Sequence, residues 1–129
     1  DGTSKGIRSY REWGPKSKIR FFKNMEPVDF LFLLKNCKAI IGNSSVAIRE
    51  CSYLGVPAVN IGSRQTGRER GKNVIDVDYK ENSIREAIDT HLKNGHYPSE
   101  HIYGDGNAGK RIAELVSDVT LQIDKILSY

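Results

Sequence analysis

The chain has 129 residues, of which 38% are hydrophobic and 28% are charged, and its formal net charge is +4. This length suits one domain and is too short for two. No apolar run approaches the roughly 20 residues that a membrane helix needs, and residues 1–5 lack the pattern of a signal peptide. The first residue is not Met, so we expect this chain to be a piece of a longer protein.

The cysteines and histidines do not predict a metal site. Cys37 and Cys51 form no C-x-x-C pair, which argues against a zinc site and a disulfide scaffold. We expect both to be small core residues of a protein in the reducing cytoplasm. His91, His96 and His101 have no metal-ligand spacing, so we expect them at the surface.

Hydrophobic periodicity and turn residues predict alternating helices and strands. A first helix of 3–13, capped by Thr3 or Ser4, precedes a strand at 18–22. The other expected helices span 28–37, 45–54, 82–92 and 108–127, and the other expected strands span 38–42, 58–61 and 74–77. The stretches 63–73 and 91–105 are expected to be irregular.

Two of these helices carry marked apolar residues. The helix at 28–37 is expected to be mostly buried because Phe30, Leu31, Leu33 and Leu34 dominate it. The helix at 108–127 has an apolar face at helical spacing. That face consists of Ile112, Leu115, Val116, Val119, Ile123 and Ile126.

Alternation of strands and helices is typical of an α/β fold, a Rossmann-like parallel sheet with helices on both faces. In such sheets, ligands bind at the carboxyl ends of the strands. Two stretches fall at that edge, the turn 42–45 and the loop 62–70. We therefore expect them to converge on one site.

The turn Gly42-Asn43-Ser44-Ser45 follows an apolar strand and opens a helix. Its N–H groups and hydroxyls suit a diphosphate, although Asn and Ser are also ordinary helix caps. Downstream, Glu50 has two interpretations as well. Its carboxylate could accept hydrogen bonds from both ribose hydroxyls, or it could be a solvated surface acid paired with a cation.

The basic stretch 64–72 contains three arginines, a lysine and two glycines. Because guanidinium groups bind phosphate oxygens bidentately, this loop could close over a phosphate. It could equally be a mobile basic surface loop. Nucleic-acid binding is not favoured, since aromatic residues are not interleaved with the basic ones. No pair of carboxylates can be placed in one cleft, so the sequence indicates no catalytic acid or base in this chain.

Five blocks in order resemble the UDP-N-acetylglucosamine 2-epimerases over about 18–112. The blocks are Gly42-Asn43-Ser44-Ser45, Arg49-Glu50, Gly55-x-Pro57, the segment from Asn60 to Arg68 with Gly-x-Arg-Gln-x-Gly-Arg at its end, and Tyr103-Gly104-Asp105-Gly106-Asn107-Ala108. The Gly-x-Arg-Gln-x-Gly-Arg segment resembles the hydrolysing branch of the family, which acts in sialic acid synthesis and forms the epimerase half of the bifunctional epimerase/N-acetylmannosamine kinase.

This resemblance implies a GT-B fold, with two Rossmann-like domains and an active site between them. It implies conversion of UDP-N-acetylglucosamine and water to N-acetylmannosamine and UDP. The C2 proton is removed, UDP is eliminated to give a glycal-type intermediate, and water adds with inversion at C2. No metal or nicotinamide cofactor takes part. The chain matches only the C-terminal, UDP-binding half. The first strand of that half, the N-terminal domain and its C2-proton carboxylates are expected outside residues 1–129.

By the same resemblance, Ser44 and Ser45 contact the diphosphate together with Asn43, and Glu50 contacts the ribose hydroxyls. Phe30 lies where the family places the uracil. Residues Arg64, Gln65 and Arg68 line the cleft near the diphosphate and sugar. One departure is that many relatives have glycines where this chain has Ser45, Val46 and Ala47. The β-branched Val46 narrows the approach to the phosphate without excluding it.

Three alternatives remain at this point: a GT-B glycosyltransferase that uses a UDP-sugar, a non-hydrolysing epimerase, and a non-enzymatic module that binds anions or nucleic acid. For the hydrolysing epimerase, we expect the chain alone to be inactive and to bind UDP weakly. We expect the full-length enzyme to be a homo-oligomer. The exposed face of the last helix is expected to promote self-association of the isolated chain.

Overall fold

A computed structural model describes residues 2–13 and 18–120. The chain divides into two units, Asp1–Leu33 and Leu34–Tyr129. In the first unit, helix α1 (Gly2–Trp13) confirms the expected helix, although it begins before the proposed caps Thr3 and Ser4. Helix α2 (Pro27–Asn36) begins in the same unit.

The expected strand at 18–22 is wrong. The structure assigns no helix or strand to 18–26, and Phe21 and Phe22 are exposed. Apolar and aromatic residues raise strand propensity, but that preference is weak unless a neighbouring strand completes the hydrogen-bond ladder. The expected burial of α2 is also mostly wrong, because only Leu34 is buried while Leu31 and Leu33 are about half exposed.

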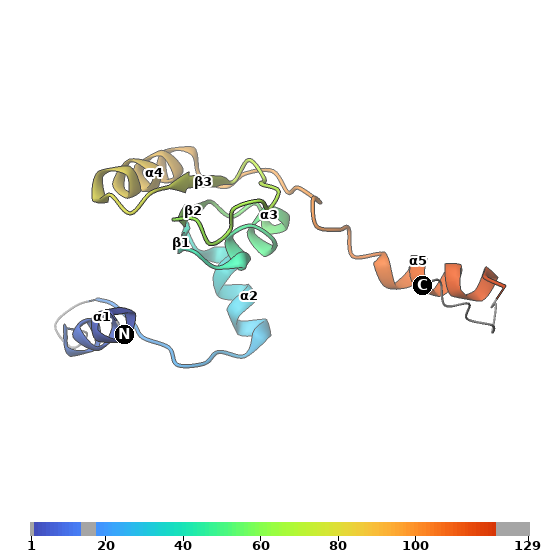
Figure 1. Cartoon of the computed structure of the whole chain (residues 1–129), viewed down its shortest axis with the longest axis horizontal. Helices are drawn as coiled ribbons and strands as arrows, with labels where there is room; N and C mark the ends of the chain where they lie inside the picture. The colour runs from blue at the N-terminus through green and yellow to red at the C-terminus, as the bar shows by residue number, and fades with distance from the viewer. Residues whose placement is uncertain (1, 14–17, 121–129) are drawn as a thin grey trace, which may run out of the picture. The chain divides into compact units, whose positions relative to one another are not determined.

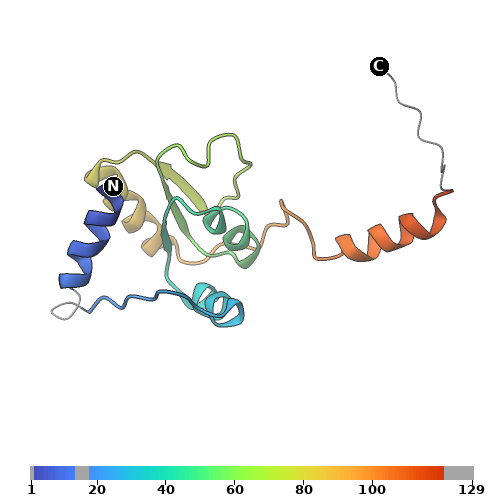
Figure 2. The same ribbon diagram turned by 60° about the horizontal axis from the view of Figure 1, so that its bottom comes forward.

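The second unit is built on a parallel sheet with the order β1-β2-β3 (Figure 1, and from another side in Figure 2). Its strands are β1 (Ile40–Gly42), β2 (Ala58–Ile61) and β3 (Val74–Val77). Strands β2 and β3 confirm the expected bounds, and β1 is two residues shorter at its start. The prediction of an α/β fold with a parallel sheet is therefore confirmed.

The core of this unit lies around the central strand. Ala58, Val59 and Asn60 of β2 are all fully buried, and successive side chains of a strand point to opposite faces, so both faces of β2 are covered. Helix α4 (Glu81–Asn94) packs against β2 and β3, while the short 3₁₀ helix η2 (Ser45–Ala47) packs against β1 and β2. This packing fixes the carboxyl edge of the sheet.

The expected helix at 45–54 is divided into η2 and a five-residue helix α3 (Glu50–Leu54). At the break between them, the carbonyl of Ala47 accepts a hydrogen bond from Asn73 Nδ2, outside the helix, at 3.4 Å. Asn73 lies just before β3 and donates to the carbonyl of Val56 at 2.8 Å as well. A tertiary contact thus interrupts a helix that local sequence favoured.

Gly55 ends α3 as expected, with φ 67° and ψ 21°. Its backbone pairs with Tyr97, whose N–H donates to the Gly55 carbonyl at 2.8 Å. A Cβ atom at Gly55 would lie 2.0 Å from the Tyr97 carbonyl oxygen. Glycine is therefore required here both by conformation and by close approach of the 95–105 segment.

The last described helix, α5 (Ala108–Asp118), is shorter than the expected 108–127. Val119 ends it in an extended conformation, and Ile123 and Ile126 lie outside the described residues. The expected apolar face is exposed: Ile112, Leu115, Val116 and Val119 are each more than half accessible. In the part of the chain that the structure describes, no helix is long and apolar enough to cross a membrane.

Candidate functional site

The first element of the candidate site is the turn after β1. Gly42 ends the strand with φ 150°, and Ser44 is extended with φ −78° and ψ 145°. The hydroxyl of Ser44 accepts a hydrogen bond from the N–H of Val46 at 3.4 Å, so Ser44 caps η2. This confirms the cap interpretation. Because η2 is only three residues long, its dipole is smaller than that of the ten-residue helix expected there.

The second element is the loop after β2, and a side chain joins it to the turn. Gln65 Nε2 donates to the Asn43 carbonyl at 2.7 Å, and the Gln65 residue is only 4% exposed. The expected convergence of the two loops is thereby confirmed. Gln65 Oε1 is buried and has no hydrogen-bond partner among the described residues, so this amide has an acceptor still to be satisfied.

The three arginines of the loop have different environments. Arg64 and Arg68 are exposed, and neither forms an ion pair within 2–13 or 18–120. Arg70 instead bonds Asp76 of β3, with Nε 3.0 Å from Oδ2 and a second guanidinium nitrogen 3.4 Å from Oδ1. Its remaining nitrogen donates to the Arg68 carbonyl. Of the three loop arginines, Arg64 and Arg68 are thus unpaired within the described residues, and Arg70 is neutralised.

Asp76 also receives a hydrogen bond from Asn60 Nδ2 at 2.6 Å. Partial burial by itself raises the pKa of Asp76, but the hydrogen bonds from Arg70 and Asn60 outweigh it and hold that pKa below its ordinary value. Sequence reasoning placed Asn60 only in a family-like block and Arg70 only among the loop arginines, and it missed Asp76 and the contacts that join the three residues. The available signal was Asn60, a polar residue inside an apolar strand.

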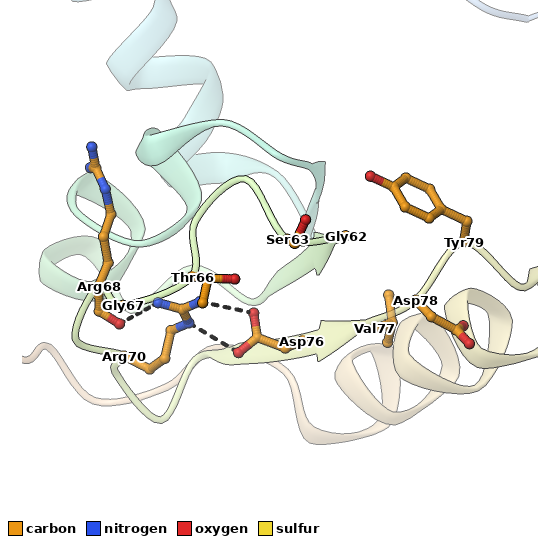
Figure 3. Close-up of a pocket in the computed structure, with 10 residues that line it drawn as sticks. All are labelled: Gly62, Ser63, Thr66, Gly67, Arg68, Arg70, Asp76, Val77, Asp78 and Tyr79. Carbon is orange, nitrogen blue, oxygen red and sulfur yellow. Dashed lines mark hydrogen bonds and ion pairs between the residues drawn. The ribbon is translucent and has the colours of Figure 1, made fainter.

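Figure 3 shows the hollow beside this loop. It is open to solvent, has a volume of about 630 Å³, and lies between the loop and the end of β3. Of the predicted site residues, only Arg68 lines it. Its walls also include Arg70, Asp76 and Asp78, and the Asp78 carboxylate pairs with Lys80 at 3.1 Å.

The 95–105 segment holds the far end of the loop. Tyr103 donates its hydroxyl to the Glu69 carbonyl at 2.7 Å, and Glu100 Oε2 accepts from the backbone N–H of Lys72 at 2.7 Å. Two residues after Tyr103, Asp105 accepts from the Asn107 N–H at 3.0 Å and bonds Arg111. The Asn107 and Arg111 contacts lower the pKa of Asp105 to about 2. The Tyr103–Ala108 block therefore both braces the loop and fixes the start of α5.

Glu50 is the first residue of α3 and is partly buried. Its Oε2 atom is buried without a hydrogen-bond partner in the described chain. The interpretation of Glu50 as a surface acid paired with a cation is therefore wrong for the described residues. Phe30 belongs to α2 in the other unit and is half-buried, and its place beside a ligand stays a prediction.

One histidine and one cysteine are structural. His91 is fully buried, which corrects the expected surface position. Its Nε2 lies 3.1 Å from the Ala58 carbonyl and its Nδ1 3.1 Å from the Tyr97 hydroxyl. Since the carbonyl can only accept, Nε2 carries the proton and Nδ1 accepts from the tyrosine. Burial lowers the pKa of His91 and raises that of Cys51 to about 12.

The other two histidines and the other cysteine are less buried than His91 and Cys51. His96 and His101 are exposed, as expected, and Cys37 is half-buried. Within the described residues, no three His, Cys, Asp or Glu side chains are grouped so as to hold a metal ion. The hydroxyls of the turn and the two exposed arginines of the loop offer hydrogen bonding and positive charge, which suits an anionic ligand.

Comparisons with known proteins agree with one another. Residues 2–117 match the family described as UDP-N-acetylglucosamine 2-epimerase. The chain is 36% identical over 92 residues to the UDP-N-acetylglucosamine 2-epimerase of Neisseria meningitidis serogroup B. This match covers 69% of this chain and 24% of that protein.

Two further relatives have names that specify hydrolysis. The UDP-N,N'-diacetylbacillosamine 2-epimerase (hydrolyzing) of Legionella pneumophila is 34% identical over 103 residues, or 80% of this chain and 27% of that protein. The GDP/UDP-N,N'-diacetylbacillosamine 2-epimerase (hydrolyzing) of Campylobacter jejuni is 44% identical over 61 residues, which make up 47% of this chain and 16% of that protein. The chain spans about a quarter of the length of the neisserial and Legionella relatives.

Proposed function

We propose, from the premise that this chain belongs to the UDP-N-acetylglucosamine 2-epimerase family, that it is part of the C-terminal, UDP-binding half of a hydrolysing 2-epimerase. The family membership confirms the resemblance found in the motifs. The proposed reaction converts UDP-N-acetylglucosamine and water to N-acetylmannosamine and UDP, with inversion at C2. The role proposed for this chain is to hold UDP as the leaving group.

One observation carries the proposal: the hydrogen bond between Gln65 and the Asn43 carbonyl, 2.7 Å long. It joins the turn after β1 to the basic loop after β2, at the sheet edge where parallel α/β folds bind ligands. The turn offers the hydroxyl-bearing residues Ser44 and Ser45, and the loop offers Arg64 and Arg68, which form no ion pair with other described residues. Together they supply the donors and positive charge that a diphosphate requires.

The same groups suit the proposed elimination. As the bond between C1 and the diphosphate oxygen breaks, negative charge accumulates on the leaving UDP. Cationic groups near the diphosphate stabilise that charge in the transition state. We propose that the carboxylates that remove and return the C2 proton belong to a second, N-terminal domain, and that the active site forms between the two domains.

Glu50 is the proposed ligand for the ribose. Its buried Oε2, which has no hydrogen-bond partner among the residues described, supports this role, because a buried carboxylate oxygen costs free energy until a donor satisfies it. Two ribose hydroxyls would provide that donor. Phe30 is proposed to lie beside the uracil.

The direct test is an NMR titration of the chain with UDP, comparing the parent with Glu50→Gln. We expect the variant to bind about tenfold more weakly, since one charged hydrogen-bond acceptor for the ribose is lost. Glu81→Gln is the matched control, because Glu81 is also the first residue of a helix and its salt bridge with Arg85 is exposed. Equal affinity of the parent and Glu50→Gln would remove Glu50 from the site.

The substrate class has two candidates, because the relatives are named for two different sugars. Assays of the full-length enzyme with UDP-N-acetylglucosamine and with UDP-N,N'-diacetylbacillosamine would separate them. A hydrolysing enzyme releases UDP and a free sugar, whereas a non-hydrolysing epimerase returns a nucleotide sugar. We expect this chain alone to release no UDP, and turnover by it at the rate of the full enzyme would contradict the division proposed here.

A further inference from the structure

The further inference concerns Asn60, Asp76 and Arg70, a polar cluster that runs from the centre of the sheet to the basic loop. Asn60 and Asp76 are register partners on the adjacent strands β2 and β3. Asn60 is fully buried in an otherwise apolar strand. A buried amide costs free energy unless it is hydrogen-bonded. Its Nδ2 donates to Asp76 at 2.6 Å, whereas its buried Oδ1 has no partner among the described residues.

Asp76 in turn is fixed at the strand end by several donors. Asn60 and a guanidinium nitrogen of Arg70 donate to Oδ1, and Arg70 Nε donates to Oδ2 at 3.0 Å. A guanidinium that contacts both oxygens of a carboxylate is held in one plane and one direction. The strand therefore fixes the position and the orientation of the Arg70 side chain.

Arg70 passes this constraint to the loop backbone. Its third nitrogen donates to the Arg68 carbonyl, two residues back along the chain, as the dashed lines of Figure 3 show. The peptide that carries Arg68 is thereby tied to β3 through one side chain. Arg68 itself is exposed and unpaired in the described chain.

We propose that Asn60, Asp76 and Arg70 are positioning residues that clamp the basic loop, so that Arg68 is presented to the diphosphate. This inference rests on the proposed function. Asp76 also neutralises Arg70, so the three arginines of the loop divide into one that shapes the loop and two that are available to an anion. In this proposal the three residues act through the loop that they hold and not by binding the diphosphate themselves.

The test is a double-mutant cycle in the chain with Asp76→Asn, Arg70→Gln and the two combined, each titrated with UDP. Both substitutions break the same contact, the ion pair between Arg70 and Asp76. We therefore expect each single variant to raise the UDP Kd about fivefold, and the double variant to raise it no further. Hydrogen exchange of the amides of 66–70 should be faster in all three, while that of α4 stays unchanged, which shows that the fold is intact.

Asp78→Asn is the matched control. Asp78 is two residues from Asp76, lines the same hollow and is also ion-paired, but its partner Lys80 is not in the loop. We expect the UDP Kd and loop exchange of this variant to match those of the parent. Additive losses in the double variant, or a loosened loop with an unchanged Kd, would overturn the clamp.

Failure of the clamp and failure of the proposed function are distinguishable. If the unchanged chain does not bind UDP at all, the proposed function is wrong. Hydrogen exchange then decides the clamp by itself: faster exchange of 66–70 in both single variants supports it, and unchanged exchange overturns it.

Discussion

The turn after β1 and the basic loop after β2 lie at the same edge of the sheet, but they are held by different kinds of contact. In the turn, Gly42 supplies a positive φ and the Ser44 hydroxyl caps the next three residues, so the shape follows from neighbouring residues. The loop is held by residues outside it, namely Asp76 on the following strand and the more distant Glu100 and Tyr103. The turn is therefore a local structure, and the loop is a tertiary one.

The difference matters because substitutions far from the loop should disturb it, whereas the turn should respond mainly to its own residues. Gln65 connects the two, because its side chain belongs to the loop and its acceptor to the turn. The following substitutions test this contrast, from the largest expected effect on stability to the smallest.

Gly55→Ala should have the largest effect. A Cβ atom there would lie 2.0 Å from the Tyr97 carbonyl oxygen, and φ is 67°, so we expect the free energy of unfolding to fall by about 3 kcal/mol. Gly67→Ala is the control, since its φ is 82° but no atom lies within 4 Å of the added Cβ; it should cost about 1 kcal/mol. Chemical denaturation measures both, and equal costs would contradict the close approach.

Substitutions of Gln65 test the connection between turn and loop. Gln65→Glu replaces the donor by a carboxylate oxygen that faces the Asn43 carbonyl in a buried position, so we expect a loss of about 2 kcal/mol. Gln65→Leu loses the same bond but also removes the unsatisfied Oε1 atom, so its loss should be nearer 1 kcal/mol. Urea unfolding at neutral pH compares them, and a smaller loss for Gln65→Glu than for Gln65→Leu would argue against this bond.

The ion pair of Asp76 predicts a pH dependence. Because its pKa in the folded chain lies below the ordinary value of 3.8, its ionised form adds stability that is fully present above that value. This stability is lost as the pH falls through the lower folded-state pKa. The difference in unfolding free energy between the parent and Asp76→Asn should therefore shrink below pH 3.8. A difference that stays constant from pH 6 to about pH 2 would contradict the stabilising ion pair.

Ser44→Ala should have the smallest effect on stability. The cap bond is long, at 3.4 Å, and exposed, so we expect a loss of about 0.5 kcal/mol. Ser45→Ala, which removes no side-chain bond of the described residues, is the control for thermal unfolding. A loss of several kcal/mol for Ser44→Ala would mean that the turn depends on more than its cap.

The same contrast explains what could be predicted from the sequence. Strands β2 and β3, the Gly55 helix end and the Ser44 cap follow from patterns within a few residues, and the structure confirms them. The break between η2 and α3 depends on Asn73, and the burial of His91 depends on Ala58 and Tyr97. Such partners are brought together only by folding, and local patterns do not contain them.

For the candidate site, the convergence of turn and loop could be predicted because parallel strands share a carboxyl edge. The sequence marked Gln65 only as part of a family-like motif. It did not indicate that the Gln65 side chain would join the loop to the turn. The sequence could not predict that Arg70 is paired while Arg64 and Arg68 are available to a ligand, because this difference depends on the contact of Arg70 with Asp76 on the next strand. The strand expected at 18–22 shows the opposite error, in which local propensity was given too much weight.

The most direct test of the central claim is hydrogen exchange of the chain with and without saturating UDP. If the turn and the basic loop form one UDP site, the amides of 43–46 and those of 63–70 should become protected together. The amides of α4, which packs against β2 and β3 and contains no proposed UDP contact, should exchange at unchanged rates. Protection of only one of the two segments, or of neither, would contradict the single site proposed here.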